Sequence, residues 1–252
     1  AVQRRHRRPA DRGVHRRRRH RRRMNCLIIA AGLGSRLRAV SPSKPLTPVA
    51  GMPLIERVIR AAAAGGASAF TVVTGHEAAR LEAFLATLAD FPIRTVRTAD
   101  WTLPNGHSVL TGAEAIQDDY LLTMADHLFD PEIARRLIAA PPAPLTLAID
   151  RALAGPLLDL DDATKVETDA AGAIVRIGKM LARYDAIDTG LFRATPALTE
   201  AIRAAPGSLS EGVQRLADRG RARTLDVTGL GWLDVDDRKS LDQATAAISL
   251  WT

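Results

Sequence analysis

The sequence predicts an α/β protein, and three observations carry this prediction. From Met24 onward, short apolar runs of strand length alternate with longer stretches of helical periodicity. The first apolar run stops at a glycine-rich turn, as strands do in parallel α/β sheets. After Asp150 the alternation gives way to two short runs around a turn, which predicts a hairpin. Together these patterns indicate a Rossmann-like, mostly parallel mixed sheet flanked by helices, with one small hairpin added.

The first half of the chain supplies the parallel strands and the helices between them. The expected strands are the apolar runs Cys26–Ala30, Phe70–Thr74, Ile93–Arg97, Tyr120–Met124 and Leu145–Asp150. Four helices are expected between them: one from Pro53 to Ala64, ended by Gly65-Gly66, one over Ala78–Leu88, a short one capped by Ser108, and one opened by Pro131.

The second half begins with the hairpin, formed by residues 163–168 and 173–178 around Asp169-Ala170-Ala171-Gly172. The remaining expected elements are a strand over Ile187–Arg193, helices over 197–205 and 211–219, strands over 223–227 and 232–235, and a last helix from Arg238. No linker interrupts this pattern, so residues 24–252 are expected to form one domain.

The composition excludes several classes of protein. The chain is 46% apolar and 25% charged, as in globular proteins, and no run of about 18 apolar residues could form a membrane helix. The single cysteine, Cys26, excludes a disulfide framework and any cysteine-based zinc site. One unpaired cysteine fits a reducing compartment, so a cytoplasmic location is expected.

Residues 1–23 form an arginine-rich arm that is expected to be disordered, because it has almost no apolar surface to bury. The arm holds twelve Arg and one Asp, which leaves 23 basic and 27 acidic residues over 24–252. It could bind nucleic acid or an anionic surface. We favour the interpretation that the natural chain starts at Met24, directly before the first strand. The mildly acidic remainder is not expected to bind nucleic acid.

A glycine-rich loop, Ala30-Ala31-Gly32-Leu33-Gly34-Ser35-Arg36, follows the first strand. Its amides could form a nest for an anion. A Walker loop requires Gly-Lys-Ser/Thr at its end, and a dinucleotide fold requires a third glycine where Leu37 stands. Both fit poorly. A nucleotidyltransferase loop keeps Arg36 on the turn and expects a lysine soon after, and Lys44 meets that requirement, in a segment that its flanking prolines are expected to hold extended.

Two aspartates follow short apolar strands. Asp126 ends the run Tyr120–Met124, and Asp234 ends the stub Trp232-Leu233. Open α/β sheets bind ligands at the carboxyl ends of their strands, and paired carboxylates suit Mg²⁺. Asp126 and Asp234 are therefore expected to ligate Mg²⁺. Asp236 is a weaker candidate because it could equally cap the last helix.

The combined pattern resembles the nucleoside-triphosphate sugar-phosphate nucleotidyltransferases, a superfamily with MobA-like NTP transferase domains. Within it the chain looks most like the CTP:inositol-1-phosphate cytidylyltransferases, from about Asn25 to its end. The motifs that carry this resemblance are Gly-x-Gly-Ser-Arg with Lys44-Pro45-Leu46, residues 105–110, 122–127, 163–166, 177–179 and 187–192, and Trp232-Leu233-Asp234-Val235-Asp236.

The resemblance implies a role for each matched residue. Arg36, Lys44 and Asp126 are expected to be catalytic. Nucleotide binding is expected from Ala30, Ala31, Gly32, Gly34, Ser35, Asn105 and Gly106. Acceptor binding is expected from Thr164, Lys165, Lys179, Asp188 and Gly190. His127 and Trp232 are expected to support or pack against the site.

The implied reaction joins CTP and inositol 1-phosphate to give CDP-inositol and pyrophosphate, with Mg²⁺, for phosphoinositide-type lipids or compatible solutes. The product is expected to pass to a separate membrane alcohol phosphotransferase. Three other acceptors stay open: phosphocholine, an aminoalkylphosphonate or a sugar 1-phosphate. A non-catalytic regulatory subunit is a further alternative. It predicts the loss of Lys44, Asp126 or Asp234, and all three are present.

Overall fold

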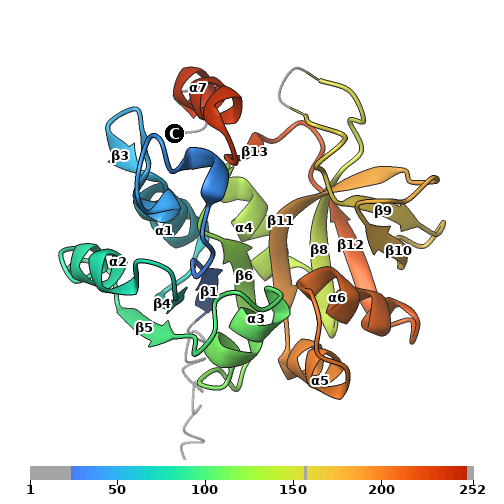
Figure 1. Cartoon of the computed structure of the whole chain (residues 1–252). Helices are drawn as coiled ribbons and strands as arrows, with labels where there is room; N and C mark the ends of the chain where they lie inside the picture. The colour runs from blue at the N-terminus through green and yellow to red at the C-terminus, as the bar shows by residue number, and fades with distance from the viewer. Residues whose placement is uncertain (1–23, 156–157, 249–252) are drawn as a thin grey trace, which may run out of the picture.

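The computed structural model describes residues 24–155 and 158–248, so the expected arm of residues 1–23 and the end of the expected domain, residues 249–252, lie outside it. Its centre is a nine-stranded mixed sheet in which β10-β9-β11-β6-β1-β4-β5 form a path and β8 joins β11 to β12. The strands of this sheet are β1 (Asn25–Ile29), β4 (Ala69–Thr74), β5 (Ile93–Arg97), β6 (Tyr120–Met124), β8 (Leu145–Asp150), β9 (Lys165–Thr168), β10 (Ile174–Gly178), β11 (Ala186–Ala194) and β12 (Ala222–Asp226). Figure 1 shows β5 and the β9–β10 hairpin at opposite sides of the molecule.

Seven α-helices flank this sheet in the described ranges. They are α1 (Leu54–Gly65), α2 (Ala78–Leu85), α3 (Gly106–Ala113), α4 (Pro131–Ala139), α5 (Pro196–Ala204), α6 (Leu209–Ala217) and α7 (Arg238–Ala247). The α/β class, the mixed sheet and the hairpin are as the sequence predicts. In the described part of the chain, no helix is long and apolar enough to span a membrane.

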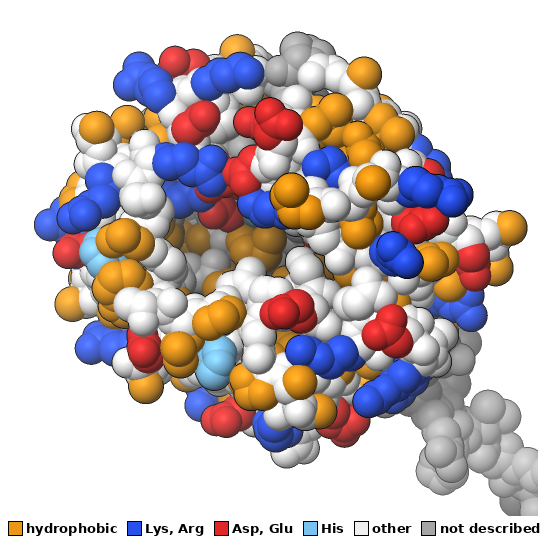
Figure 2. Space-filling view, turned by 45° about the vertical axis from the view of Figure 1, so that its right-hand side comes forward, with side chains coloured by type: hydrophobic (Ala, Val, Ile, Leu, Met, Phe, Trp, Pro, Cys, Tyr) orange, Lys and Arg blue, Asp and Glu red, His pale blue; other side chains and the backbone are white. Residues whose placement is uncertain are grey.

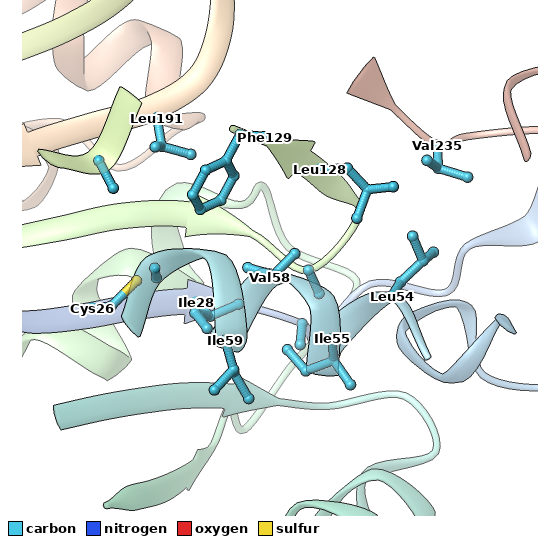
Figure 3. Packing of buried hydrophobic residues seen from close by; sticks show 14 of the residues in the cluster. Cys26, Ile28, Leu54, Ile55, Val58, Ile59, Leu128, Phe129, Leu191 and Val235 are labelled. Atoms are coloured by element: carbon cyan, nitrogen blue, oxygen red, sulfur yellow. The ribbon is translucent and has the colours of Figure 1, made fainter. Parts of the chain in front are cut away.

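The first half of the sheet is parallel, and its alternating side chains build two cores. β1 pairs with β4 and β6, and β4 pairs with β5, all in parallel. Cys26 and Ile28 point to the side covered by α1, α2, α4 and α7, whereas Leu27 and Ile29 point to the side covered by α3, α5 and α6. Figure 3 shows Val58 and Ile59 of α1 beside Ile28 on the first of these sides.

The second half is built on β11, a long strand with antiparallel partners on both edges. Its carboxyl half pairs with β6, its amino end pairs with β9, and β8 runs along its other edge. The β8 ladder shifts register between Asp188 and Phe192. Within this bulge Gly190 adopts φ +78°, a left-handed conformation that glycine tolerates best. The bulge leaves Asp188 at an irregular point of the sheet, next to the site described below.

Two short strands complete the site, and only the second of them, over residues 232–235, was expected from the sequence. β7 (His127–Phe129) pairs with β13 (Trp232–Asp234), so that Asp234 lies opposite His127. The amide of Val235 also donates to the carbonyl of Asp126 at 3.0 Å. A second small pair joins β2 (Pro48–Val49) to β3 (Met52–Pro53). The β7–β13 ladder attaches the C-terminal segment beside the end of β6.

Several predicted boundaries were wrong, each for a local reason. The short helix begins at Gly106, and Ser108 is buried inside it instead of capping it. α6 begins at Leu209, because Ser208 and Glu211 form a capping box. α2 ends at Leu85, three residues before the expected end at Leu88. Pro53 belongs to β3 and is not the first residue of α1. Lys44–Leu46 is a 3-10 turn, η2, and not an extended segment, since the amides of Leu46 and Thr47 donate back to Ser43 and Lys44.

Candidate functional site

Two neighbouring cavities open at the carboxyl ends of the parallel strands. The smaller, about 270 Å³, lies over the glycine-rich loop, and the larger, about 290 Å³, lies between the loop and the hairpin. Both are lined by Arg36, Asp126 and Asp236. Figure 2 shows a hollow on one face of the molecule, with acidic and basic side chains side by side along one edge of it. Two cavities that share charged groups can hold two ligands in contact with each other.

The glycine-rich loop forms the wall of the smaller cavity. Gly34 adopts φ +60°, and a Cβ there would lie 2.3 Å from the Cβ of Lys44. Only glycine therefore lets the loop close over Lys44. Among the described residues, no backbone carbonyl accepts a hydrogen bond from Gly32, Gly34 or Ser35. These amides line an open cavity and are available to bind an anion.

Lys44 is buried beneath the loop and makes two ion pairs. Its Nζ contacts Asp126 and Asp236, and only 9% of its side chain is exposed. Burial alone would lower the pKa of Lys44, but Asp126, Asp236 and Asp234 outweigh burial and raise it. The ammonium therefore stays charged beside two carboxylates that line both cavities.

The ion pairs continue from Lys44 as a chain of alternating charge. Asp236 accepts a hydrogen bond from Nη2 of Arg36 at 2.8 Å, and the same nitrogen donates to Asp162 at 2.8 Å. Asp162 in turn pairs with Lys179. This charge chain, Lys44–Asp236–Arg36–Asp162–Lys179, runs from the loop to the hairpin and connects the expected catalytic and acceptor-binding cations.

Three groups at the other side of Lys44 form a candidate metal centre. Ligand atoms of Asp126, His127 and Asp234 lie within 4.8 Å of one another. Nδ1 of His127 is 2.8 Å from Asp126, and Nε2 is 3.8 Å from Asp234. The pairing of β7 with β13 creates this cluster, because it sets Asp234 opposite His127.

The electrostatics of this cluster fit a divalent cation. Oδ1 of Asp234 is buried without a hydrogen-bond partner in the described part of the chain. Burial, together with Asp126 and Asp236, raises the pKa of Asp234 to about 6. Burial alone would lower the pKa of His127, but Asp234, Asp126 and Asp188 raise it to about 9. The raised pKa values of Asp234 and His127 both reflect an excess of carboxylates in this cluster, which a divalent cation such as Mg²⁺ would offset.

The ring of His127 packs directly against Gly190, where no side chain could be accommodated. A Cβ at Gly190 would lie 1.9 Å from Cδ2 of His127, and the backbone there has φ +78°. We expect Gly190→Ala to lower the free energy of unfolding by about 2 kcal/mol or more, because both the backbone and the ring must move. Urea denaturation measures this change. Gly178→Ala is the matched control, because a Cβ there meets nothing within 4 Å, and an equal loss in both variants would contradict this role.

The larger cavity also has a carboxylate and an indole in its wall. Asp188 lines it and accepts a hydrogen bond from the amide of Gly190 at 2.7 Å, and burial raises the pKa of Asp188 to about 6. Trp232 lines it as well, and Nε1 of its indole donates to Asp150 at 2.8 Å. The expectation that Trp232 only packs was therefore incomplete. Its ring gives this cavity an apolar wall of fixed orientation.

Asn105 and Gly106 have clear structural roles. Oδ1 of Asn105 accepts a hydrogen bond from the amide of Leu209 at 2.8 Å, which fixes the start of α6. A Cβ on Gly106 would lie 2.2 Å from the carbonyl oxygen of Gly207, so glycine lets the two segments touch. Asn105 lines the larger cavity.

Most of the expected site residues gather around the two cavities. The smaller cavity is lined by Ala30, Gly32, Gly34, Ser35, Arg36, Lys44 and Asp126. The larger is lined by Arg36, Asn105, Asp126, Thr164, Lys179, Asp188 and Asp234. Four lie outside both linings: Ala31, Gly106, Lys165 and Gly190. The ammonium of Lys165 donates to the carbonyl of Lys179 at 2.8 Å and lies over the ring of Tyr184, so it supports the hairpin.

The sequence prediction missed Asp162 and undervalued His127 and Asp236. Asp162 follows no strand and belongs to no motif that we recognised. Asp236 and Asp237 are adjacent carboxylates that look alike in sequence, yet Asp237 caps α7 and Asp236 pairs with Lys44. One indirect signal was available, because residues 24–252 contain only four lysines. Two of them, Lys44 and Lys179, form ion pairs with Asp236 and Asp162 respectively.

Two curated relatives match most of this chain. The chain is 34% identical over 230 residues to a bifunctional IPC transferase and DIPP synthase of Rubrobacter xylanophilus, covering 89% of this chain and 52% of the relative. It is also 34% identical over 244 residues to the CMP-5'-(3-aminopropyl)phosphonate synthase of Streptomyces rubellomurinus, covering 88% of this chain and 38% of the relative. The chain thus spans about half, or less, of the length of these curated relatives.

A solved structure shares the fold. The inositol-1-phosphate CTP transferase from T. maritima superposes with a TM-score of 0.81 at 20% identity, over 90% of this chain and 96% of that one. A family model, the MobA-like NTP transferase domain, matches residues 26–221. The glycine-rich loop, Lys44 and Asp126 all lie inside that match. The chain therefore belongs to the family of MobA-like NTP transferase domains, which are nucleotidyltransferase enzymes.

Proposed function

We propose that this enzyme transfers the cytidylyl group of CTP to inositol 1-phosphate, giving CDP-inositol and pyrophosphate. An oxygen of the acceptor phosphate forms a bond to the α-phosphorus, and the bond from that phosphorus to the β-phosphate oxygen breaks. One observation carries the proposal. Two neighbouring cavities share Arg36, Asp126 and Asp236 in their walls, and each has a lysine of its own, Lys44 in the smaller and Lys179 in the larger, so two phosphates could meet between them.

The side chains supply positioning and charge in this reaction. The loop amides, Arg36 and Lys44 would hold the triphosphate in the smaller cavity, and Lys179 would hold the acceptor phosphate in the larger one. The acceptor phosphate is mostly a dianion at pH 7, so it needs no strong base to attack. The main barrier is repulsion between two anions, and fixed cations between them lower it.

We propose Mg²⁺ as the metal ion, held by Asp126 and Asp234. The unpartnered Oδ1 of Asp234 and the carboxylate chemistry of the pair support this assignment. When bound, Mg²⁺ neutralises charge on the triphosphate and the pyrophosphate that leaves. Lys44 contacts Asp126 and keeps that carboxylate ionised, because its charge helps hold the pKa of Asp126 well below the usual range despite burial.

The identity of the acceptor rests on the larger cavity. A cyclitol phosphate offers an anion for Lys179, hydroxyls for Asp188 and an apolar ring face for Trp232, and all three side chains line the cavity. An aminoalkylphosphonate is the second candidate. The surplus of carboxylates in this lining, among them Asp159 and Asp188, could also bind an ammonium group, and the Streptomyces relative is named for such a substrate.

Pyrophosphate release tests the proposal. The enzyme is incubated with Mg²⁺, with CTP, UTP, dTTP, ATP or GTP, and with inositol 1-phosphate, 3-aminopropylphosphonate, phosphocholine or glucose 1-phosphate. We expect the highest kcat/KM for CTP with inositol 1-phosphate. Faster turnover with 3-aminopropylphosphonate would transfer the assignment to the second acceptor, and no release with any pair would contradict the proposed activity.

Lys179 provides a sharper test of the acceptor side. We expect Lys179→Ala to raise the KM for inositol 1-phosphate about 10-fold or more while changing the KM for CTP much less, because the loss is one charge-assisted contact to the acceptor phosphate. Steady-state kinetics with each substrate varied in turn measures both values. Lys239→Ala is a control, since Lys239 lines the same cavity but does not belong to the charge chain. A larger rise in the KM for CTP than in the KM for inositol 1-phosphate would indicate that Lys179 contacts the nucleotide instead.

The product and location follow from the same chemistry. CDP-inositol carries an activated phosphoryl group, so we propose that a membrane alcohol phosphotransferase activity consumes it, for lipid or compatible-solute synthesis. We also propose that the enzyme works in the cytoplasm, where CTP is available and where its one cysteine, the buried and unpaired Cys26, stays reduced.

A further inference from the structure

Asp162 lies between the two cations that the proposed function assigns to the two substrates. Its Oδ2 accepts a hydrogen bond from Nη2 of Arg36 at 2.8 Å, and its Oδ1 pairs with Nζ of Lys179. Arg36 belongs to the glycine-rich loop, whereas Lys179 follows β10 of the hairpin. One carboxylate thus connects the two halves of the site, and no other described acid pairs with both.

These contacts are the ones that phosphate oxygens would make. The side chains of Arg36 and Lys179 are each 54% exposed, so a ligand in the cavities can reach both. The Asp162 side chain lines the larger cavity and is 30% exposed. Ion pairs as exposed as these are weak and exchange readily for a stronger anion. A substrate phosphate can therefore displace the carboxylate.

The two contacts of Asp162 support each other. While Arg36 holds the carboxylate in place, Asp162 is positioned to bind Lys179, and the reverse also applies. When the triphosphate takes Arg36, Asp162 loses one of its two anchors, and its hold on Lys179 weakens. The acceptor phosphate then meets a cation that is easier to release. By linkage, the acceptor must favour CTP by the same factor.

We propose that Asp162 is a positioning residue that substitutes for the substrate phosphates in the free enzyme and couples the binding of the two substrates. This role rests on the proposed function. The proposed role of Asp162 has three consequences. Each substrate alone binds in competition with Asp162, and each substrate promotes the binding of the other. Both effects depend on the charge of the Asp162 side chain.

Isothermal titration calorimetry tests the coupling without turnover. The ligands are inositol 1-phosphate and a CTP analogue with a methylene group between the α- and β-phosphorus atoms, each titrated alone and with the other at saturation, in Mg²⁺. We expect each ligand to tighten the other about 3- to 10-fold in the wild-type enzyme. In Asp162→Asn, each ligand alone should bind about 3- to 10-fold more tightly, and the coupling factor should fall towards 1.

Matched variants separate this role from a structural one. Asp161→Asn changes an exposed neighbour whose side chain makes no hydrogen bond or ion pair in the described structure, and it should behave as the wild type. Asp162→Glu keeps the charge and should keep the coupling. Asp162→Ser replaces the Asn variant if circular dichroism shows that the latter is unfolded. Weaker binding of both ligands in the folded variant, or coupling that persists in it, would overturn the proposal.

The same preparation distinguishes failure of this inference from failure of the proposed function. Wild-type enzyme that releases pyrophosphate from CTP and inositol 1-phosphate, while Asp162→Asn retains full coupling, contradicts only the role of Asp162. Wild-type enzyme that binds neither ligand and releases no pyrophosphate contradicts both.

Discussion

Replacing Asp126 by Asn is expected to lower turnover about 100-fold or more. Asp126 is the carboxylate that ends β6, contacts Lys44 and His127, and faces both cavities. The amide cannot supply the negative charge that a bound Mg²⁺ and Lys44 require, and losses of this size follow the removal of one key electrostatic group. The measurements are kcat for pyrophosphate release and the Kd for Mg²⁺ from calorimetry.

The matched control for this variant lies at the other end of the same segment. Asp118 is exposed just before β6 and its side chain makes no hydrogen bond or ion pair among the described residues, so Asp118→Asn should retain normal kinetics. Asp234→Asn should also weaken Mg²⁺ binding, since its unpartnered oxygen is the second proposed ligand. Near-normal turnover and unchanged Mg²⁺ affinity in both Asn variants would contradict the metal assignment.

Replacing Lys44 by Ala should have an effect of similar size and should also destabilise the protein. We expect kcat/KM to fall about 100-fold or more, because the fixed charge between the two phosphates is lost. Asp126 and Asp236 would then face each other without the ammonium that separates them. Since both acids are partly exposed, we expect a loss of about 1–3 kcal/mol in the free energy of unfolding.

Mg²⁺ should distinguish these two consequences of losing Lys44. A divalent ion can replace the missing charge near Asp126, so saturating Mg²⁺ should recover part of the stability of Lys44→Ala but little of its rate. Urea denaturation with and without Mg²⁺, followed by steady-state assays on the folded variant, measures both. A variant that loses stability alone, with its rate intact, would show that Lys44 has only a structural role.

The sequence was informative wherever one local feature determined the outcome. Continuous apolar runs predicted the parallel strands, and the glycine-rich turn predicted the loop that closes over Lys44. Asp126 could be found because a carboxylate at the end of a parallel strand lies at the edge where such sheets bind ligands. The hairpin was equally clear from its turn.

The parts that could not be predicted depend on contacts between distant segments. β7 has only three residues, too few to show periodicity. A strand over 232–235 was expected, but its pairing with β7, which brings Asp234 to His127, was not. Asp162 acquires its role only because the hairpin and the loop approach it from two sides. The bulge in β11 and the packing of Gly190 against His127 likewise depend on how the strands pair, so the sequence alone does not predict them.

The pairing of β7 with β13 has a consequence for how the enzyme acquires activity during folding. Asp236 stands 192 positions from Lys44 along the chain, and the family match ends at residue 221, before β13. Contacts of such long range close late, because the intervening chain must first be ordered. Most of the sheet can therefore assemble while Arg36 and Lys44 still lack Asp236. A refolding enzyme should regain its far-ultraviolet signal before it regains turnover, with the C-terminal segment as the last component to arrive.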